Sequence, residues 1–432
     1  MTRRLLFLAD SASQLKPAYT LASAFRERHG WEIVGNLLPG NSMVSNRQLL
    51  DADVRCPITA HSLGKLATMG LFSEFDAVVA FLPGSRLHAL LAHIDRSLAR
   101  KNASTRPALI TGYNGVVYEG YLEGLLWRTG YDFVCVNSRA DQRLFTSYLD
   151  ELDHSGERLI ATGFLLAQGG VERLRPYGEM PNRDILFATQ AIVPARREER
   201  EYILEGLRSY AEAFPDRKVI IKPRALPGER TFHEERHHYA LLYDGLYGQS
   251  KPANLLFGYG SLDSYLDRVG LVLSVSSTAV IEALSRGVPG AILGDFGLKE
   301  SLGNHFFRNS GMVTTIPDLI GDRVPAADPD WLLDNGFAPD DSVDLLVDGV
   351  MEFCEAQASS GRRTPMLSPY YDGATAPYVY QQVLPTRDER PARVPGRLEA
   401  TLRKTRKLLL SPRAFISDAK SPVDVVRRIL SR

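Results

Sequence analysis

The sequence predicts an α/β protein built from two Rossmann-like domains, and three observations lead to this prediction. Short apolar segments alternate with longer amphipathic segments, which is typical of β–α–β units on a parallel sheet. These segments form two successive series, and residues 166–183 between them are rich in glycine and proline, as expected of a linker. The length of 432 residues is sufficient for two or three domains with sizeable cores.

The expected strands follow one another in two sets of six. The first set spans residues 5–9, 31–35, 77–81, 108–111, 133–136 and 159–161. The second set spans residues 185–188, 219–222, 255–257, 271–275, 290–293 and 312–315. We therefore expect an N-terminal domain over 1–170, a C-terminal domain over 180–365, a crossover segment over 366–390 and a tail over 391–432. Because open α/β sheets bind ligands at the carboxyl ends of their strands, two such domains facing a cleft predict a small, anionic, nucleotide-like ligand between them.

Composition restricts the class of protein. With 44% apolar and 24% charged residues and no net charge, the chain is neither collagenous, nor wholly disordered, nor a disulfide scaffold. The three cysteines lie far apart without CxxC spacing, which favours a reducing compartment. No apolar run approaches the ~18–20 residues that span a bilayer, and the apolar start is too short for a signal peptide. We expect a cytoplasmic protein. The absence of Gly-x-Gly-x-x-Gly and Walker A motifs argues against a dehydrogenase and an NTPase.

The strongest local pattern is residues 271–294, which predict a strand, a hydroxyl-rich turn, a helix and a second strand. Ser276, Ser277 and Thr278 stand where the helix begins, so one hydroxyl can cap it while the others and free backbone N–H groups bind an anion. Glu282 lies one turn into the helix, within reach of a ribose hydroxyl or of the turn itself. The alternative is plain helix capping beside a solvated glutamate.

A second pattern surrounds the expected strand 219–222. Lys222 and Arg224 emerge at its end, and two cations there suit a diphosphate, or a phosphate together with a sugar carboxylate. Gln190 ends the preceding strand and is placed to contact a base or a sugar. The alternative is a surface loop with solvated cations.

Together these two patterns resemble the nucleotide-binding half of GT-B glycosyltransferases. The nearest resemblance is to bacterial capsule polysialyltransferases and Kdo transferases, which use CMP-activated acidic sugars, and to actinobacterial glycosyltransferases without an assigned substrate. By this resemblance Ser276 and Ser277 match the Ser-Ser motif that binds phosphate or carboxylate. Arg224 and Ala225 stand where the family has its His-Pro motif. The resemblance covers residues 184–300, and the first half only in architecture.

An inverting transferase needs a base for the acceptor hydroxyl. Capsule sialyltransferases place an acidic-acidic-Gly motif in the N-terminal domain, and Glu119 before Gly120 is a partial match. Asp10, at the end of the first strand, is its rival, and both residues have the alternative of a solvated carboxylate or cap. Three histidines, His233, His237 and His238, lack a metal-site pattern, so we expect neither a metal nor a cofactor. His233 is nearest to the Lys222–Arg224 loop and is a candidate substrate contact.

The tail differs in charge from the rest of the chain. From Pro391 onward there are eleven Lys and Arg residues against three Asp and Glu residues. Leu398, Leu402 and Leu409 fall on one face of a helix, which predicts binding to anionic lipid on the inner face of the membrane. No aromatic residue interleaves these charges as nucleic-acid stacking requires. A solvated or crossover helix is the alternative.

These patterns predict metal-independent sugar transfer from a nucleotide-sugar donor to a glycan or glycolipid acceptor, with CMP-activated acidic sugars favoured. Three alternatives stay open. The first is a UDP-sugar-dependent GT-B glycosyltransferase. The second is a glycerophosphotransferase that uses CDP-glycerol. The third is a nucleotide-sugar binder or epimerase that transfers nothing.

Overall fold

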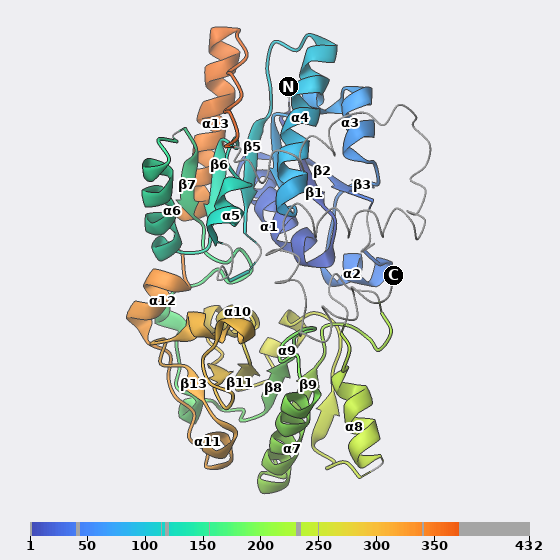
Figure 1. Ribbon diagram of the computed structural model, residues 1–432, viewed down its shortest axis with the longest axis vertical. Helices are drawn as coiled ribbons and strands as arrows, with labels where there is room; N and C mark the ends of the chain where they lie inside the picture. Colours follow the sequence, from blue (N-terminus) through green and yellow to red (C-terminus); the bar gives the residue numbers. More distant parts are fainter. Residues whose placement is uncertain are drawn as a thin grey trace, which may run out of the picture. The chain divides into compact units, whose positions relative to one another are not determined.

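The computed structural model describes residues 2–39, 44–113, 115–116, 121–154, 156–229, 235–248, 250–338 and 341–370. Within these residues the chain forms two parallel β-sheets flanked by helices, which confirms the predicted fold class (Figure 1). Each of the twelve expected strands is present to within two residues at its ends. Glu119, His233, the crossover segment beyond Tyr370 and the basic tail lie outside the described residues.

The N-terminal sheet has seven strands in the order β3-β2-β1-β4-β5-β6-β7, with every neighbouring pair parallel. Its strands are β1 (Arg4–Ala9), β2 (Glu32–Leu37), β3 (Ile58–Thr59), β4 (Ala77–Ala80), β5 (Ala108–Gly112), β6 (Phe133–Val136) and β7 (Arg158–Ala161). The two-residue strand β3 is the one that the sequence did not predict.

Helices cover both faces of this sheet, so its central strands are apolar on both sides. Leu5 and Phe7 of β1 face the helices α1 (Ala12–His29) and α13 (Ser342–Ser360). The alternate residues, Leu6 and Leu8, face α3 (Leu63–Met69), α4 (Gly84–Lys101) and α6 (Arg139–Glu151). Two short helices complete this half, α2 (Asn46–Asp51) and α5 (Tyr121–Leu126).

The C-terminal sheet has six parallel strands in the order β10-β9-β8-β11-β12-β13. Its strands are β8 (Ile185–Ala188), β9 (Val219–Lys222), β10 (Leu255–Phe257), β11 (Leu271–Ser274), β12 (Gly290–Leu293) and β13 (Val313–Thr314). One face packs on α7 (Arg197–Ala213), α8 (Tyr239–Tyr247) and α11 (Ile316–Ile320). The other packs on α9 (Asp263–Leu266), α10 (Ala279–Ser285) and α12 (Pro329–Asn335).

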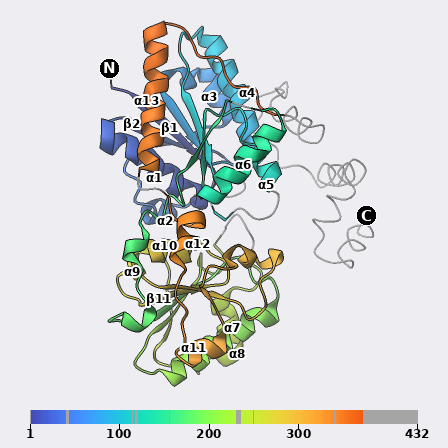
Figure 2. The same cartoon turned by 90° about the vertical axis from the view of Figure 1, so that its left-hand side faces the viewer.

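Helix α13 returns to the N-terminal sheet, although it lies within the range expected for the C-terminal domain (Figure 2). Its residues Leu346, Val347 and Val350 are fully buried in the core formed with β1 and α1. After α13, the chain is held by Arg106, whose guanidinium donates to the backbone oxygens of Thr364 and Pro365, each at 2.8 Å. The two halves of the fold therefore do not correspond to two continuous stretches of sequence.

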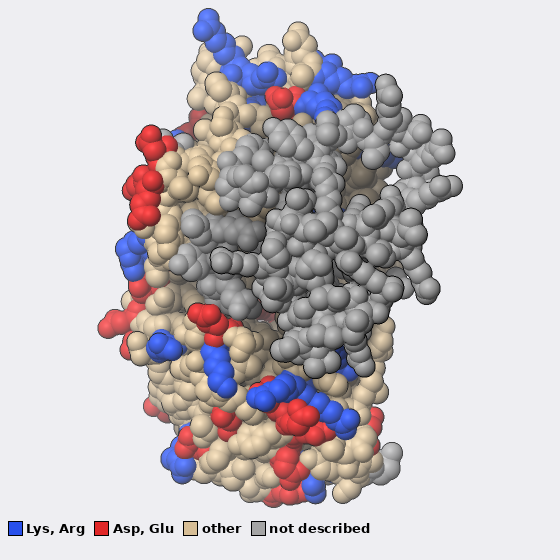
Figure 3. Space-filling view, viewed as in Figure 1, with Lys and Arg blue, Asp and Glu red and all other residues tan. Residues whose placement is uncertain are grey.

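In the described part of the chain, no helix has both the length and the apolar character that crossing a membrane requires. On the face shown in Figure 3, basic and acidic side chains of the described residues lie intermixed rather than in separate regions.

Candidate functional site

Strand order reverses at one point in each sheet, between β1 and β4 in the N-terminal sheet and between β8 and β11 in the C-terminal sheet. Open α/β sheets bind their ligands outside the carboxyl ends of the strands at such a point. Gln190 and Ser276 lie just after β8 and β11, and Asp10 directly follows β1. Three of the predicted site residues therefore lie at the two positions where this fold class binds ligands.

At the C-terminal point, Gln190 and Ser276 are bonded to each other. The backbone N–H of Ser276 donates to Gln190 Oε1 at 3.0 Å, and Gln190 Nε2 donates to Ser276 Oγ at 3.0 Å. Ser274 Oγ also donates to the carbonyl of Ala188 at 2.8 Å. These bonds fix the two loops relative to each other, so the polar groups beyond them are preorganised.

The rest of the hydroxyl-rich turn leads into α10, as predicted. Ser277 Oγ accepts from the backbone N–H of Ala279 at 3.2 Å, so this hydroxyl caps the helix. Thr278 is the N-cap residue by position, but its side chain makes no capping hydrogen bond. Ser276 is buried, whereas Ser277 and Thr278 are half-buried. Of the two half-buried hydroxyls, that of Ser277 is thus engaged in capping, whereas that of Thr278 is not.

Lys222 is the last residue of β9 and lies opposite Ala188, the last residue of β8. Its side chain thus starts from the same sheet edge as Gln190. Burial lowers the pKa of the Lys222 ammonium to about 8, although Glu282 and Asp51 act in the opposite direction. Arg224, two residues further on, is exposed. Both cations follow the strand end as the sequence predicted.

Glu282 lies in the first turn of α10 and is half-buried, not a solvated carboxylate. The pKa of its carboxyl group is raised to about 7, chiefly by burial and also by the neighbouring Asp263, against the opposing effect of Lys16 and Lys222. Glu282 therefore belongs to the same charge cluster as Lys222.

At the N-terminal point, Asp10 is buried and forms an ion pair with Arg86 of α4, with Oδ2 and Nη1 2.9 Å apart. Burial raises the pKa of the Asp10 carboxyl group, and Arg86 counteracts this. Arg86 Nη2 also donates to the carbonyl of Pro39 at 3.3 Å. The carboxylate is thus held in one orientation at the carboxyl edge of the N-terminal sheet.

Among the described residues, ion pairs join the N-terminal half to the C-terminal half at three places, one of which is Arg143 of α6 with Asp334 of α12. The other two start from α1 and α2. Lys16 Nζ in the first turns of α1 lies 2.6 Å from Asp263 Oδ2 in α9. Arg47 Nη2 in α2 lies 2.5 Å from Glu229 Oε2, in the loop that follows Lys222 and Arg224. Because Lys16 also acts on Glu282 and Lys222, the N-terminal half contributes charge to the candidate site.

Comparison with known protein families decides the class of protein. Residues 5–350 match the model of a family described as "Putative glycosyltransferase (DUF6716)". The chain belongs to this family. The enzyme class expected from the sequence, a glycosyltransferase, is therefore confirmed at the level of the family. No curated protein matches the sequence significantly.

Solved structures agree on the fold. UDP-GlcNAc 2-epimerase from Methanocaldococcus jannaschii aligns with a TM-score of 0.51 and 12% identity, over 82% of this chain and 100% of that one. Arabidopsis thaliana UGT89C1, solved in complex with UDP, aligns with a TM-score of 0.50 and 11% identity, over 81% and 100% of the two chains. At this identity the likeness shows the fold alone, the two-sheet arrangement of GT-B enzymes.

Sequence reasoning missed Arg200, which supports the loop that carries Gln190. This arginine of α7 is buried, and its guanidinium donates to the carbonyls of Gln190 at 3.1 Å and Ala191 at 2.8 Å. It also pairs with Glu235 at 2.8 Å. In the sequence Arg200 is one of six consecutive charged residues, 196–201, at the start of an amphipathic helix, so nothing distinguishes it from its solvated neighbours.

Arg86 and Lys16 were also missed, but the sequence contains a signal for them. Both lie in the first turns of helices that directly follow strands β4 and β1. A cation there is near the carboxyl edge of the sheet, where the ligands of this fold class bind. Cations in the first turns of helices that follow a strand of the N-terminal series could therefore have been predicted as site residues, and Arg86 and Lys16 are two of them.

Proposed function

We propose that this family member transfers a sugar from a UDP-sugar to a hydroxyl group of a glycan or glycolipid, without a metal ion. The observation that carries the proposal is the convergence of Gln190, Ser276 and Lys222 on the carboxyl edge of three neighbouring strands, β8, β11 and β9. Hydroxyl, amide and ammonium groups arranged in this way suit a nucleotide phosphate.

The choice of donor differs from the one that the sequence favoured. Lys222 and Arg224 supply two cations beyond one strand end, which supports a diphosphate. Two proteins that share the fold act on or bind uridine diphosphate compounds, which supports UDP over CMP. A CMP-activated acidic sugar, as used by the capsule enzymes, is the competing donor, and the experiment below separates the two.

In the proposed reaction, a carboxylate removes the proton from the acceptor hydroxyl, whose oxygen attacks the anomeric carbon while the sugar–phosphate bond breaks. Lys222, Arg224 and the hydroxyl of Thr278 would stabilise the charge on the departing diphosphate. Asp10 and Glu119 are the two candidates for the base. The raised pKa of Asp10 supports its candidacy, because a general base works best with a pKa nearer to neutrality.

Thermal-shift and calorimetric titration of the protein with UDP, CDP, GDP and CMP test the donor site. We expect UDP to bind most tightly, and Arg224→Ala to weaken UDP binding about tenfold because a charge-assisted contact is lost. Lys218→Ala is the matched control, since Lys218 is exposed and precedes β9 at its opposite end. A preference for CMP would contradict the UDP donor, and turnover of a UDP-sugar without any acceptor would indicate an epimerase instead.

The pH dependence of UDP binding gives an independent prediction about Lys222. Its pKa of about 8 means that the ammonium is charged below pH 8 and neutral above it. We expect UDP affinity to fall about tenfold between pH 7 and pH 9.5. The groups that act on Lys222 are Glu282, Asp51, Arg47 and Lys16, of which Glu282 ionises near pH 7 and also disfavours an anion at higher pH. In Lys222→Arg, which stays charged, the decrease near pH 8 should disappear; a decrease retained in that variant would argue against Lys222 as its source.

Membrane docking through the segment from Pro391 onward is part of this proposal, and it would bring the enzyme to lipid-linked acceptors. Flotation of the full chain with anionic liposomes, compared with a chain that ends at residue 390, measures it. Equal flotation of the two would remove this part of the proposal.

A further inference from the structure

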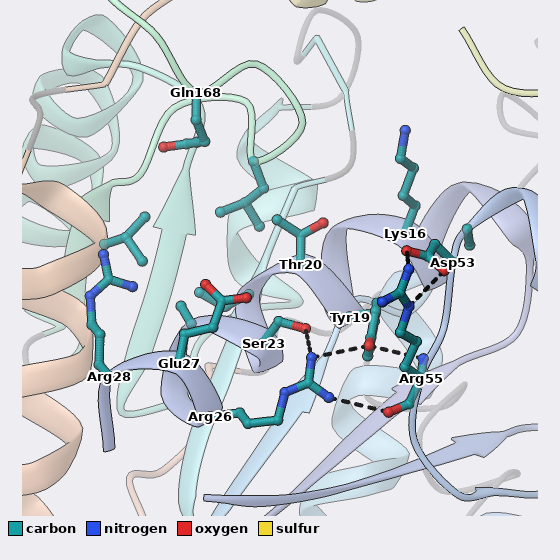
Figure 4. A pocket seen from close by; sticks show the side chains of 15 residues that line it. Lys16, Tyr19, Thr20, Ser23, Arg26, Glu27, Arg28, Asp53, Arg55 and Gln168 are labelled. Carbon is teal, nitrogen blue, oxygen red and sulfur yellow. Dashed lines mark hydrogen bonds and ion pairs between the residues drawn. The ribbon is translucent and has the colours of Figure 1, made fainter. Parts of the chain in front are cut away.

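A groove of about 580 Å³ runs along helix α1 in the N-terminal half (Figure 4). Its lining includes Ala52, Asp53 and Arg55, which follow α2, and Val343 of α13. Leu165 and Gln168, which follow β7, also line the groove. None of the groups predicted for donor binding lines this groove.

The floor of the groove is a polar stripe of α1. Lys16, Thr20, Ser23 and Glu27 all line it, and their spacing of three or four residues places them on one face of the helix. At 1.5 Å per residue this stripe is about 16 Å long. Hydroxyl, ammonium and carboxylate groups in a row offer both donors and acceptors along an extended path. Such a surface suits a chain of hydroxylated rings better than a flat aromatic base.

Arg26 gives the groove a positively charged site. Its guanidinium donates to the carbonyl oxygen of Arg55 at 3.2 Å, to the hydroxyl of Tyr19 at 3.2 Å and to Ser23 Oγ at 3.3 Å. Among the described residues, no carboxylate lies within ion-pairing distance of Arg26. The three bonds orient the guanidinium without neutralising it. An oriented guanidinium of this kind is well suited to bind a carboxylate.

The other cations of the lining are already paired. Lys16 pairs with Asp263, Arg28 with Asp344, and Arg55 with Asp53. Arg26 is therefore the cation of the described groove lining that remains to bind an anionic substituent, and one carboxylate of the ligand is placed on it. The hydroxyl of Tyr19, the aromatic residue that lines the groove, accepts from both Arg26 and the backbone N–H of Arg55 at 2.9 Å.

We propose that this groove binds the acceptor as an oligosaccharide that carries a carboxylate, with the carboxylate on Arg26. The inference rests on the proposed function, because it assigns the groove to the second substrate of the transfer. Helix α1 connects the two sites: it begins at Ala12, two residues after Asp10, and Lys16 both lines the groove and pairs with Asp263 beside the donor residues. An acceptor lying along α1 would thus point one end toward the candidate base.

Calorimetric titration of the full chain with trigalacturonic acid, a carboxylated trisaccharide, tests the proposal, and its methyl ester is the uncharged match. We expect the acid to bind and the ester to bind at least about tenfold more weakly. Arg26→Ala should weaken binding of the acid about tenfold. Thr20→Lys adds a cation to the groove floor and should tighten binding about two- to fivefold. Arg100→Ala, at an exposed position on α4 of the same half, should change affinity less than about twofold.

Three results would overturn the proposal. The acid and the ester could bind equally well, the acid could fail to bind, or neither Arg26→Ala nor Thr20→Lys could change the affinity for the acid. Thermal unfolding of Arg26→Ala shows whether that variant is folded, and Thr20→Lys tests the groove without removing any of the contacts described for Arg26. UDP titrated into the same samples keeps the two proposals distinguishable. Loss of trigalacturonate binding with intact UDP binding rejects the groove alone. Absence of UDP binding in the unmodified protein rejects the donor proposal instead.

Discussion

Replacing Arg106 with alanine is expected to lower the free energy of unfolding by about 3–5 kcal/mol. The Arg106 side chain is 1% exposed and binds Asp132 through both carboxylate oxygens, at 2.7 and 2.8 Å. Without the guanidinium, the Asp132 side chain stays buried and, among the described residues, keeps the backbone N–H of Leu109 as its single donor. The carbonyls of Thr364 and Pro365 also lose their donor. Equilibrium unfolding in urea measures the effect.

Arg158→Ala is the matched control for this prediction. Arg158 forms an ion pair with Glu352 of α13 at 3.7 Å, but both side chains are mostly exposed. We expect its removal to cost about 0–1 kcal/mol. Similar losses in the two variants would mean that burial of the Arg106 pair is not what stabilises the return of the chain to the N-terminal sheet.

Replacing Arg200 with methionine is expected to destabilise the protein by about 3–5 kcal/mol and to weaken UDP binding. Methionine fills the same space but donates no hydrogen bond, so Glu235, whose side chain is 9% exposed, loses its ion-pair partner. The carbonyls of Gln190, Ala191 and Pro194 lose a shared donor at the same time. Because Gln190 bonds Ser276, we expect the displacement of the Gln190 loop to reach the proposed donor site. Urea unfolding and UDP titration read the two effects separately.

Arg197→Met on the same helix is the control, since Arg197 forms an exposed ion pair with Glu201. We expect it to change stability by less than about 1 kcal/mol and to leave UDP affinity unchanged. If Arg200→Met lost stability but bound UDP normally, Arg200 would be a purely structural residue. Arg200→Lys, which keeps the charge but not the planar fork of donors, should recover only part of the loss.

The strands could be predicted because each of them is an apolar run between polar segments, and in a parallel sheet covered on both faces such runs are unmistakable. Strand β3 could not be predicted, because the two residues Ile58–Thr59 are too few to form an apolar pattern. The packing of α13 on the N-terminal sheet could not be predicted for a different reason. Its apolar residues predict a buried face but do not identify the sheet on which that face packs.

The candidate site likewise has features that a local sequence pattern predicts and features that depend on which distant segments are neighbours in the fold. The positions of Gln190, Lys222 and Ser276 at the carboxyl edge could be predicted, because strand ends are visible in the sequence, and their role in binding stays a prediction. The bond between Gln190 and Ser276 depends on β8 and β11 being neighbours, which no local pattern encodes. Arg200 depends on five partners in two loops outside its helix, of which Glu235 and His237 lie more than thirty residues away, so its sequence context predicts only an ordinary amphipathic helix.

The return of α13 has a consequence for how the protein is made. The last strand of the N-terminal sheet leaves the ribosome roughly 180 residues before α13, a delay of about 10–35 s at usual rates of translation. During that interval the second sheet is synthesised, while the side of the first sheet that later receives Leu346, Val347 and Val350 remains uncovered. The half that is translated first is therefore completed only once α13 has been made, and until then the nascent chain exposes the apolar surface that α13 later covers.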